Sequence, residues 1–227
     1  MKWLFKWLFR LVLLAVALVV ILLLARNAIL RVYLEHQIYA QTGMDAEMGS
    51  FSLGLAEPTV TIQDLRLYNP PAFAGTPFLN IREIHAEYDP AALAKHELHL
   101  TLMRFNLGEL DIVKNEAGQT NLFALGLTLP SAKAVNGRKA AELTSDFKRQ
   151  TGFDFTGIDV LNVSVGTARF IDLKDQGHNC TQKIDIENCV LKEVKTPADL
   201  AGLALLVALR GGDFFGSLAG LSDHGTN

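Results

Sequence analysis

An unbroken run of fifteen apolar residues, from Leu11 to Ala25, constrains this chain most. Apolar and aromatic residues lengthen the run upstream, so it approaches the ~20 residues that a membrane-spanning helix needs. Lys6 and Arg10 interrupt the upstream part but can extend toward lipid headgroups, and Trp3 and Trp7 suit a membrane interface. The sequence therefore predicts a single N-terminal transmembrane helix.

A cleaved secretion signal is the alternative, because a basic start and a short apolar centre also fit that template. No clear small-x-small cleavage site follows the apolar run, and a helical pattern continues through Ile38 to an end at Gly43. Both observations favour a retained anchor with a helical extension over residues 1–43. Three basic residues precede the span and two follow it closely, which predicts a cytoplasmic N-terminus and a main body outside the cytoplasm.

The remainder of the 227-residue chain is acidic. Five of the 21 basic residues precede the first acidic residue, Glu35, which leaves 16 basic against 24 acidic residues and a net charge of −8. An acidic body has no electrostatic footprint for nucleic acid, so we expect no nucleic-acid partner. Its length is that of one domain.

From Ala46 the apolar residues alternate with polar ones, which is the period of a half-buried strand. The alternation slips by one residue at Gln63 and Asp64, which indicates a bulge or bend. It is clearest from Glu97 to Arg104, where one face is predicted to hold Leu98, Leu100 and Leu102, and the other Glu97, His99, Thr101 and Met103.

Turn signals separate these strands. Asn69 to Pro71 predicts a turn, a further strand covers Phe78 to Tyr88, and Pro90 begins a short helical turn that ends at Leu93. The next strand is predicted at Leu110 to Val113, followed by a hairpin turn at Asn115 to Gly118. Strands joined by short turns imply an antiparallel sheet, beginning with a β domain over residues 44–130.

The second half is predicted to continue the same sheet. Residues 131–152 form a linker that contains a possible helix, and strands over residues 153–196 extend the sheet. Pro197 begins an apolar helix over residues 197–210, because a missing amide costs little in a first turn. That helix is buried against the sheet, packed on a partner, or lying on a membrane surface. Residues 211–227 read as a flexible tail.

Motifs of catalysis, metal binding or cofactor binding are missing from the sequence: it holds no nucleophile elbow, phosphate loop, zinc-protease motif or dinucleotide fingerprint. We therefore expect no enzyme, no metal and no cofactor. His96 and His99 fall on opposite faces of a strand, and Asp172 and Asp175 are typical of a turn. Cys180 and Cys189 form a disulfide only if the chain reverses between them, which the sequence leaves open.

The order of these features resembles the AsmA-like family of membrane-anchored proteins that face the periplasm of Gram-negative bacteria. Four segments after the anchor carry the resemblance: VTIQDLRLYNPPAF at Val60–Phe73, FLNIREIHAEYDPAAL at Phe78–Leu93, LHLTLMRF at Leu98–Phe105 and LDIVKNEAGQTNLFAL at Leu110–Leu125. It covers residues 1 to about 125 and extends weakly to KTPADLAGL at Lys195–Leu203.

The resemblance implies a curved sheet with an apolar concave groove, and a role in carrying phospholipid toward the outer membrane. Many relatives are several times longer, so a single copy of this chain is not expected to bridge a periplasm. The residues expected to line the groove are Ile62, Leu65, Leu67, Ile81, Ile84, Leu98, Leu100, Leu102 and Ile112. The same residues would equally form a closed core.

Two hypotheses of function follow. The first is a single-pass inner-membrane protein with a periplasmic body that binds or guides phospholipid along an apolar β groove, in envelope assembly or lipid homeostasis. Its partners are membrane lipids, with other envelope proteins or a second copy of the chain in addition. The second is a membrane-tethered structural or adaptor module with a closed core, which binds another envelope protein through an edge strand or the final apolar helix.

Overall fold

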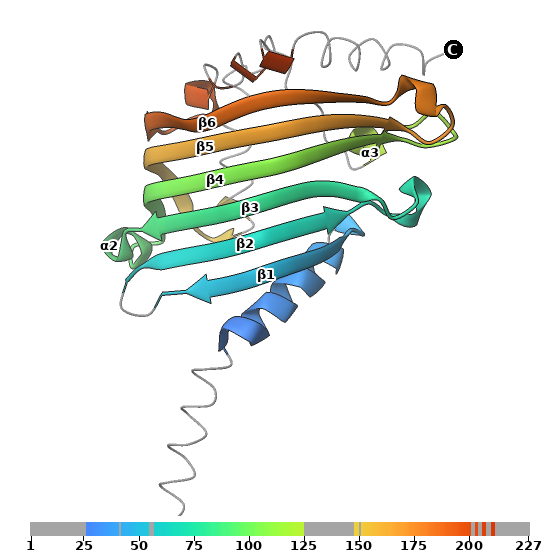
Figure 1. The fold of residues 1–227 in the computed structure, drawn as a ribbon. Helices are drawn as coiled ribbons and strands as arrows, with labels where there is room; N and C mark the ends of the chain where they lie inside the picture. Colours follow the sequence, from blue (N-terminus) through green and yellow to red (C-terminus); the bar gives the residue numbers. More distant parts are fainter. Residues whose placement is uncertain are drawn as a thin grey trace, which may run out of the picture.

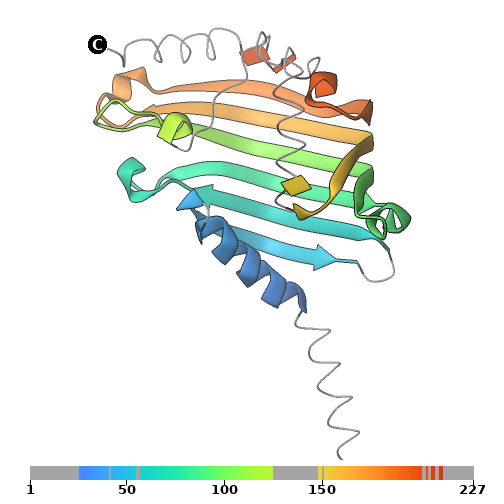
Figure 2. The ribbon, with the colours of Figure 1, turned by 180° about the vertical axis from the view of Figure 1, so that it is seen from behind.

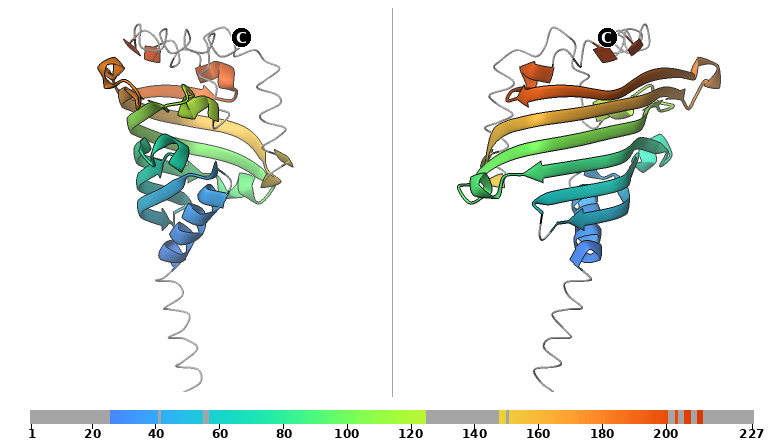
Figure 3. Two further views of the ribbon diagram at one scale, coloured as in Figure 1. Left: turned by 90° about the vertical axis from the view of Figure 1, so that its right-hand side faces the viewer. Right: turned by 60° about the vertical axis from the view of Figure 1, so that its left-hand side comes forward.

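The computed structural model describes residues 26–40, 42–54, 57–124, 148–149, 151–200, 203, 206–207 and 210–211. Within these residues six strands form one sheet and lie in the order of the sequence (Figure 1). They are β1 Asp45–Leu53, β2 Thr59–Tyr68, β3 Pro77–Tyr88, β4 Glu97–Lys114, β5 Asp154–Asp172 and β6 Cys180–Val194. Seen from its end, the sheet is twisted and curved (Figure 3). The mainly β fold that the alternation predicts is confirmed.

Short helical turns join the strands. They are η1 Pro71–Phe73, α2 Pro90–Leu93, α3 Asn121–Ala124, η2 Gln176–His178 and η3 Pro197–Leu200. Proline at the first position and an aspartate cap explain why α2 begins where it does, because the Asp89 carboxylate accepts a hydrogen bond of 2.7 Å from the Ala91 amide. The turn predicted from Asn69, Pro70 and Pro71 lies between β2 and β3, as expected.

The pairing of β4 with β5 is parallel, whereas all other neighbouring strands pair antiparallel. The prediction of an antiparallel sheet is therefore wrong at this pair, and the sheet is mixed. A parallel pair needs a long crossover, which the chain between Lys114 and Asp154 provides. The strand expected to begin after Gly108 is also no separate element, since β4 runs through that glycine to Lys114.

The slip predicted at Gln63 and Asp64 is confirmed as a backbone irregularity. Asp64 has a φ of 51° and lies opposite Gly49 of β1, between the paired residues Met48–Leu65 and Ser50–Gln63. A Cβ on Gly49 would approach the Asp64 Cβ to 2.9 Å, so only glycine fits there. Across this slip Ile62 and Leu65 pack in the same apolar cluster, although they are three residues apart.

Close backbone contact between β4 and β5 continues the irregularity across the sheet. A Cβ on Gly166 would lie 2.4 Å from the Gly108 carbonyl oxygen, and a Cβ on Gly108 would lie 2.9 Å from Nε of Arg82. The register of β4 against β3 also shifts at Asn80 and Ile81. Gly166 therefore stands where two strand backbones approach too closely for any side chain, whereas a side chain at Gly108 would displace Arg82.

Residues 26–40 form a helix along the outer edge of β1, on the side of the sheet seen in Figure 2. Its polar side chains bind backbone groups of β1 that would otherwise face outward. Arg26 donates to the Leu53 carbonyl at 2.7 Å, Arg31 donates to the Gly49 carbonyl at 3.1 Å, and Glu35 accepts from the Met48 amide at 2.8 Å. The helix thus closes one edge of the sheet, which protects it from pairing with another chain.

The same helix turns two apolar side chains inward, since Leu34 and Ile38 pack against a cluster of Met48, Leu65 and Ile81. Among the described residues, none of the helices has the length and apolar character needed to cross a membrane. The apolar run from Leu11 to Ala25, with Trp3, Lys6, Trp7 and Arg10, lies outside them.

At the C-terminal side, η3 takes the place of the first turn of the helix expected over residues 197–210. Residues 203, 206, 207, 210 and 211 are helical, and Leu203, Leu206 and Val207 pack against the sheet. These three side chains are partly buried there. Residues 148, 149 and 151 are helical as well, while the other residues of the expected linker and most of the expected tail lie outside the described residues.

Candidate functional site

One side of the sheet carries a continuous band of apolar side chains, which we call the apolar face. It consists of three clusters built on Ile112 and Phe170, on Leu161 and Val163, and on Met48, Leu65 and Ile81. The clusters share members, because Leu67 packs on the first and third, Phe105 on the second and third, and Val165 on the first and second. The band therefore extends from β1 to β6 without a polar break.

The covering of the apolar face is uneven. At one end α3 lies on the side of the sheet seen in Figure 2. Its Leu122 packs with Ile112, which has no exposed surface. Helix 26–40 covers the β1 side through Leu34 and Ile38. In the centre, the β4 side chains of Met103, Phe105 and Leu107, together with Ile62 and Ile84 beside them, stay partly exposed.

Most residues expected to line a groove lie in this band. Ile62, Leu65, Ile81 and Ile84 belong to the third cluster, Leu67 joins the third to the first, Leu100 belongs to the second and Ile112 to the first. Leu98 and Leu102 belong to none of the three. The structure thus brings together side chains from β2, β3 and β4.

Thr101 explains why the stripe of Leu98, Leu100 and Leu102 divides. It is an extra residue in β4, since Tyr88 of β3 pairs with Leu100 while the preceding Glu87 pairs with Leu102. An extra residue changes which side chains face the same side, so Leu100 and Met103 pack on one cluster. The expectation that Met103 faces away from Leu100 is therefore wrong. The sequence did not predict Phe105 and Leu107 as residues of the apolar face, because they come after the bulge, where the alternation has changed phase.

The other side of β4 and β5 is charged. Asp111 is 1% exposed and accepts two hydrogen bonds from Arg169, at 2.7 and 2.6 Å, while Arg169 also contacts Glu109 at 2.6 Å. The hydrogen bond to Asp111 raises the pKa of Arg169, against the opposing effect of burial. The guanidinium therefore stays charged and neutralises the buried carboxylate. In this part of β4 and β5 the sheet has one apolar side and one charged side.

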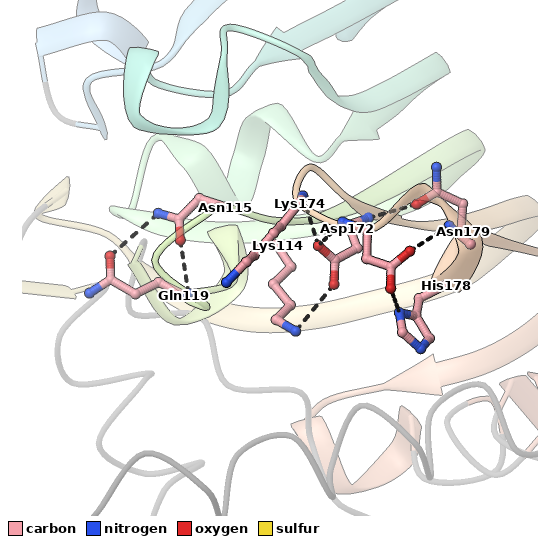
Figure 4. Close-up of polar contacts among 9 residues, drawn as sticks. Lys114, Asn115, Gln119, Asp172, Lys174, His178 and Asn179 are labelled. Carbon is pink, nitrogen blue, oxygen red and sulfur yellow. Dashed lines mark hydrogen bonds and ion pairs between the residues drawn. The ribbon is translucent and has the colours of Figure 1, made fainter.

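The β5–β6 turn is a polar network at the end of the sheet (Figure 4). Asp172 is 4% exposed and accepts from the amides of Lys174 and Asp175 and from Nζ of Lys114 at 3.2 Å. Burial raises its pKa, but these hydrogen bonds outweigh it, so the pKa of Asp172 lies below its usual value. Asp175 in turn accepts from the Gly177 amide. The prediction that these aspartates serve a turn is confirmed.

A buried amide pair links two of the segments that carry the family resemblance, Val60–Phe73 and Leu110–Leu125. Asn121 has no exposed surface, and its side chain accepts from the Val113 amide and donates to the Asp111 carbonyl and to Oδ1 of Asn69. Asn69 continues to the Pro77 carbonyl at 3.2 Å. The Asn-Pro turn and the turn after β4 are thus joined at one end of the sheet, and both asparagines are structural residues.

The two cysteines are free thiols, and both stand in β6. Cys180 pairs with Phe170 and Cys189 with Val163, so no chain reversal separates them. Nine residues of extended strand span roughly 30 Å, far beyond the ~7 Å between Cα atoms that a disulfide allows. The disulfide that the sequence left open does not form within this chain.

The histidines singled out in the sequence do not converge either. His96 stacks on Phe153 with ring centroids 5.7 Å apart, while His99 pairs with Asp159 at 3.1 Å. Among the described residues, His, Cys, Asp and Glu side chains form no group of three that could hold a metal ion.

Comparison with protein-family models, with curated proteins and with solved structures finds no match to this chain. The resemblance to the AsmA-like family therefore stays a prediction from the sequence. The partly exposed centre of the apolar face is the candidate functional site.

Proposed function

We propose that this chain is a membrane-anchored protein that binds or guides phospholipid along the apolar face, in envelope assembly or lipid homeostasis. The run from Leu11 to Ala25 anchors it in a bacterial inner membrane, with the N-terminus in the cytoplasm and the sheet in the periplasm. The observation that carries the proposal is the partly exposed centre around Met103, Phe105 and Leu107. The AsmA-like resemblance points to the same class of ligand.

The proposed mechanism is passive. An acyl chain that leaves the bilayer gains about 0.8 kcal/mol for each methylene that it buries against the apolar side chains. β4 has 18 residues and extends about 60 Å at 3.3 Å per residue, twice the ~30 Å of a bilayer's hydrocarbon core. The strand is thus long enough to hold an extended acyl chain against the apolar face.

Site-specific photocrosslinking in the full chain tests this proposal. A benzophenone amino acid replaces Phe105 in one variant and the adjacent Arg104, which is exposed and pairs with Glu83 at 3.4 Å, in the other. Neighbouring residues of a strand face opposite sides, and the register is continuous here on both flanks. After illumination in membranes, we expect a phospholipid adduct at position 105 and none at 104. If neither position forms a phospholipid adduct, the proposal is refuted.

The adaptor module remains the second candidate, because β6 is the outermost strand of the sheet and its Val190 is 51% exposed. Exposed apolar residues on an edge strand favour a protein partner. The same crosslinking residue at position 190 separates the two functions. A protein adduct at 190 without a lipid adduct at 105 would establish the adaptor.

A further inference from the structure

Helix 26–40 presents apolar side chains on the side that faces away from the sheet. Five large hydrophobic residues are more than half exposed among the residues that the structure describes, and four of them belong to this helix. Their exposed fractions are 55% for Ile29, 63% for Val32, 56% for Tyr33 and 53% for Tyr39. Surface helices of soluble domains usually carry polar residues there.

The spacing of these four residues places them on one stripe. Relative to Ile29 they stand at i+3, i+4 and i+10, which in an α-helix places them on one face about 120° wide. His36 and Ala40 complete the stripe, and both are exposed. The stripe holds no acidic residue, and the Tyr33 hydroxyl is bound by Gln37 at 3.0 Å.

The helix cannot rotate to bury the stripe. The side chains of Arg26, Arg31 and Glu35 hold the helix to β1, because they satisfy backbone groups of the strand edge. Leu34 and Ile38 are held by the third apolar cluster. Turning the stripe inward would break these hydrogen bonds and expose both inward side chains.

Continuity with the N-terminal apolar run identifies what covers the stripe. That run ends at Ala25, and the described part of the helix starts at the next residue, so Ile29 stands four residues, about one helical turn, beyond a bilayer that takes up Leu11 to Ala25. Tyrosines are favoured at this depth, because their rings are apolar and their hydroxyls reach water. A bilayer surface therefore matches both the position and the composition of the stripe.

We propose that the stripe of Ile29, Val32, Tyr33 and Tyr39 lies in the interfacial layer of the membrane, so that helix 26–40 rests along the surface and fixes the sheet's orientation to the bilayer. The proposal rests on the membrane attachment within the proposed function, but not on lipid binding by the apolar face. The helix then has two apolar sides for two reasons: one packs on the sheet and the other on lipid.

The test uses the full chain in vesicles of phosphatidylethanolamine and phosphatidylglycerol. Cys180→Ser and Cys189→Ser remove the native thiols, and single cysteines are placed by V32C, Y39C or V190C and labelled with a polarity-sensitive fluorophore. Val190 is the matched control, because it is a valine that is also more than half exposed and lies on the far edge of the sheet. Circular dichroism confirms that each variant retains its strands.

We expect spin-labelled lipids to quench the fluorophore several-fold more at positions 32 and 39 than at 190. Two positions are needed because a helix standing upright would lift residue 39 about 10 Å above residue 32. Quenching that falls at 39 to the level of 190 would overturn the proposal. So would a water-exposed fluorophore at 32 in protein that floats with the vesicles.

Two other outcomes would overturn it for different reasons. Protein that fails to float with vesicles would remove the membrane attachment itself. A fluorophore at position 32 could also be shielded from water without being quenched by spin-labelled lipid. If that shielding disappears when the protein in the vesicles is diluted, a second copy of the chain covers the stripe. A missing lipid adduct at position 105 with strong quenching at 32 and 39 would refute the proposed function alone.

Discussion

Replacing Asn121 by alanine tests whether the buried amide pair holds the end of the sheet together. The Asn121 side chain makes three hydrogen bonds of 2.9 to 3.0 Å, to Val113, Asp111 and Asn69, and none of its surface is exposed. Asn121→Ala leaves the Val113 amide and the Asp111 carbonyl without this partner inside the fold. Each buried polar group left unpaired costs about 1–3 kcal/mol, so we expect a loss of about 4 kcal/mol in the free energy of unfolding.

A loss of this size is a large part of the about 5–15 kcal/mol that stabilises a typical domain. Urea unfolding of the full chain in detergent micelles, followed by far-ultraviolet circular dichroism, measures it as a lower midpoint at constant slope. Asn162→Ala is the matched control, because that amide reaches only Asn188, at 3.5 Å on the surface, and its loss should cost under about 0.5 kcal/mol.

Adding Asn69→Ala to Asn121→Ala checks the network itself. The two side chains share one hydrogen bond, which each single variant removes. The losses in free energy of unfolding of the two single variants should therefore add up to more than the loss of the double variant. If Asn121→Ala matches Asn162→Ala in stability, the amide pair does not hold the turns and our reasoning is wrong.

Four further predictions follow from the same structure. Gly166→Ala should lower the midpoint of thermal unfolding strongly, because its Cβ would meet a carbonyl oxygen at 2.4 Å. Gly177→Ala is the control and should change the midpoint little, because its Cβ meets only a turn side chain at 3.1 Å. Equal midpoints would contradict the close approach of β4 and β5. Arg169→Met should cost about 3–5 kcal/mol in urea unfolding by leaving Asp111 buried and unpaired, and Asp111→Leu in the same chain should restore much of it. Leu100→Asp should remove copurifying phospholipid, measured by mass spectrometry, from a protein with unchanged circular dichroism; retained lipid would count against the apolar face as the site. Asp172→Asn should destabilise the protein at neutral pH. Because the folded-state pKa of Asp172 is lowered, the stabilisation by its carboxylate is present above the usual aspartate pKa and disappears on acidification below about pH 4. The urea-unfolding midpoints of the variant and of the unchanged protein should therefore converge at acidic pH.

Local pattern was sufficient to predict most of the strands and turns. The slip at Asp64 is visible in the sequence because the alternation changes phase there, and the Asn-Pro turn carries its own chemistry. Strand direction is not visible, since β4 and β5 alternate in the same way whether they run parallel or antiparallel. The direction of β5 depends on its pairing with β4, whose residues are far away in the sequence.

The candidate site was predictable where a strand stays in phase. Ile62 and Ile84 lie in the apolar face as expected, whereas Leu102 and Met103 exchange roles because Thr101 adds one residue to β4. The sequence could not show which side of helix 26–40 is exposed, because both sides carry apolar residues. Only the contacts with the sheet distinguish the inward side from the exposed stripe. The disulfide depended on a chain reversal that the continuous β6 excludes.

The parallel pairing of β4 and β5 also sets the order in which this chain can fold. β1 to β4 pair with their neighbours in sequence, so this half can assemble as soon as it is synthesised. The 18 residues of β4 then present an unpaired edge until the chain as far as Asp172 has emerged. An edge of this length invites pairing with another chain, so the nascent protein is most prone to aggregation in that interval. The second half of the chain, with β5 and β6, ends that exposure.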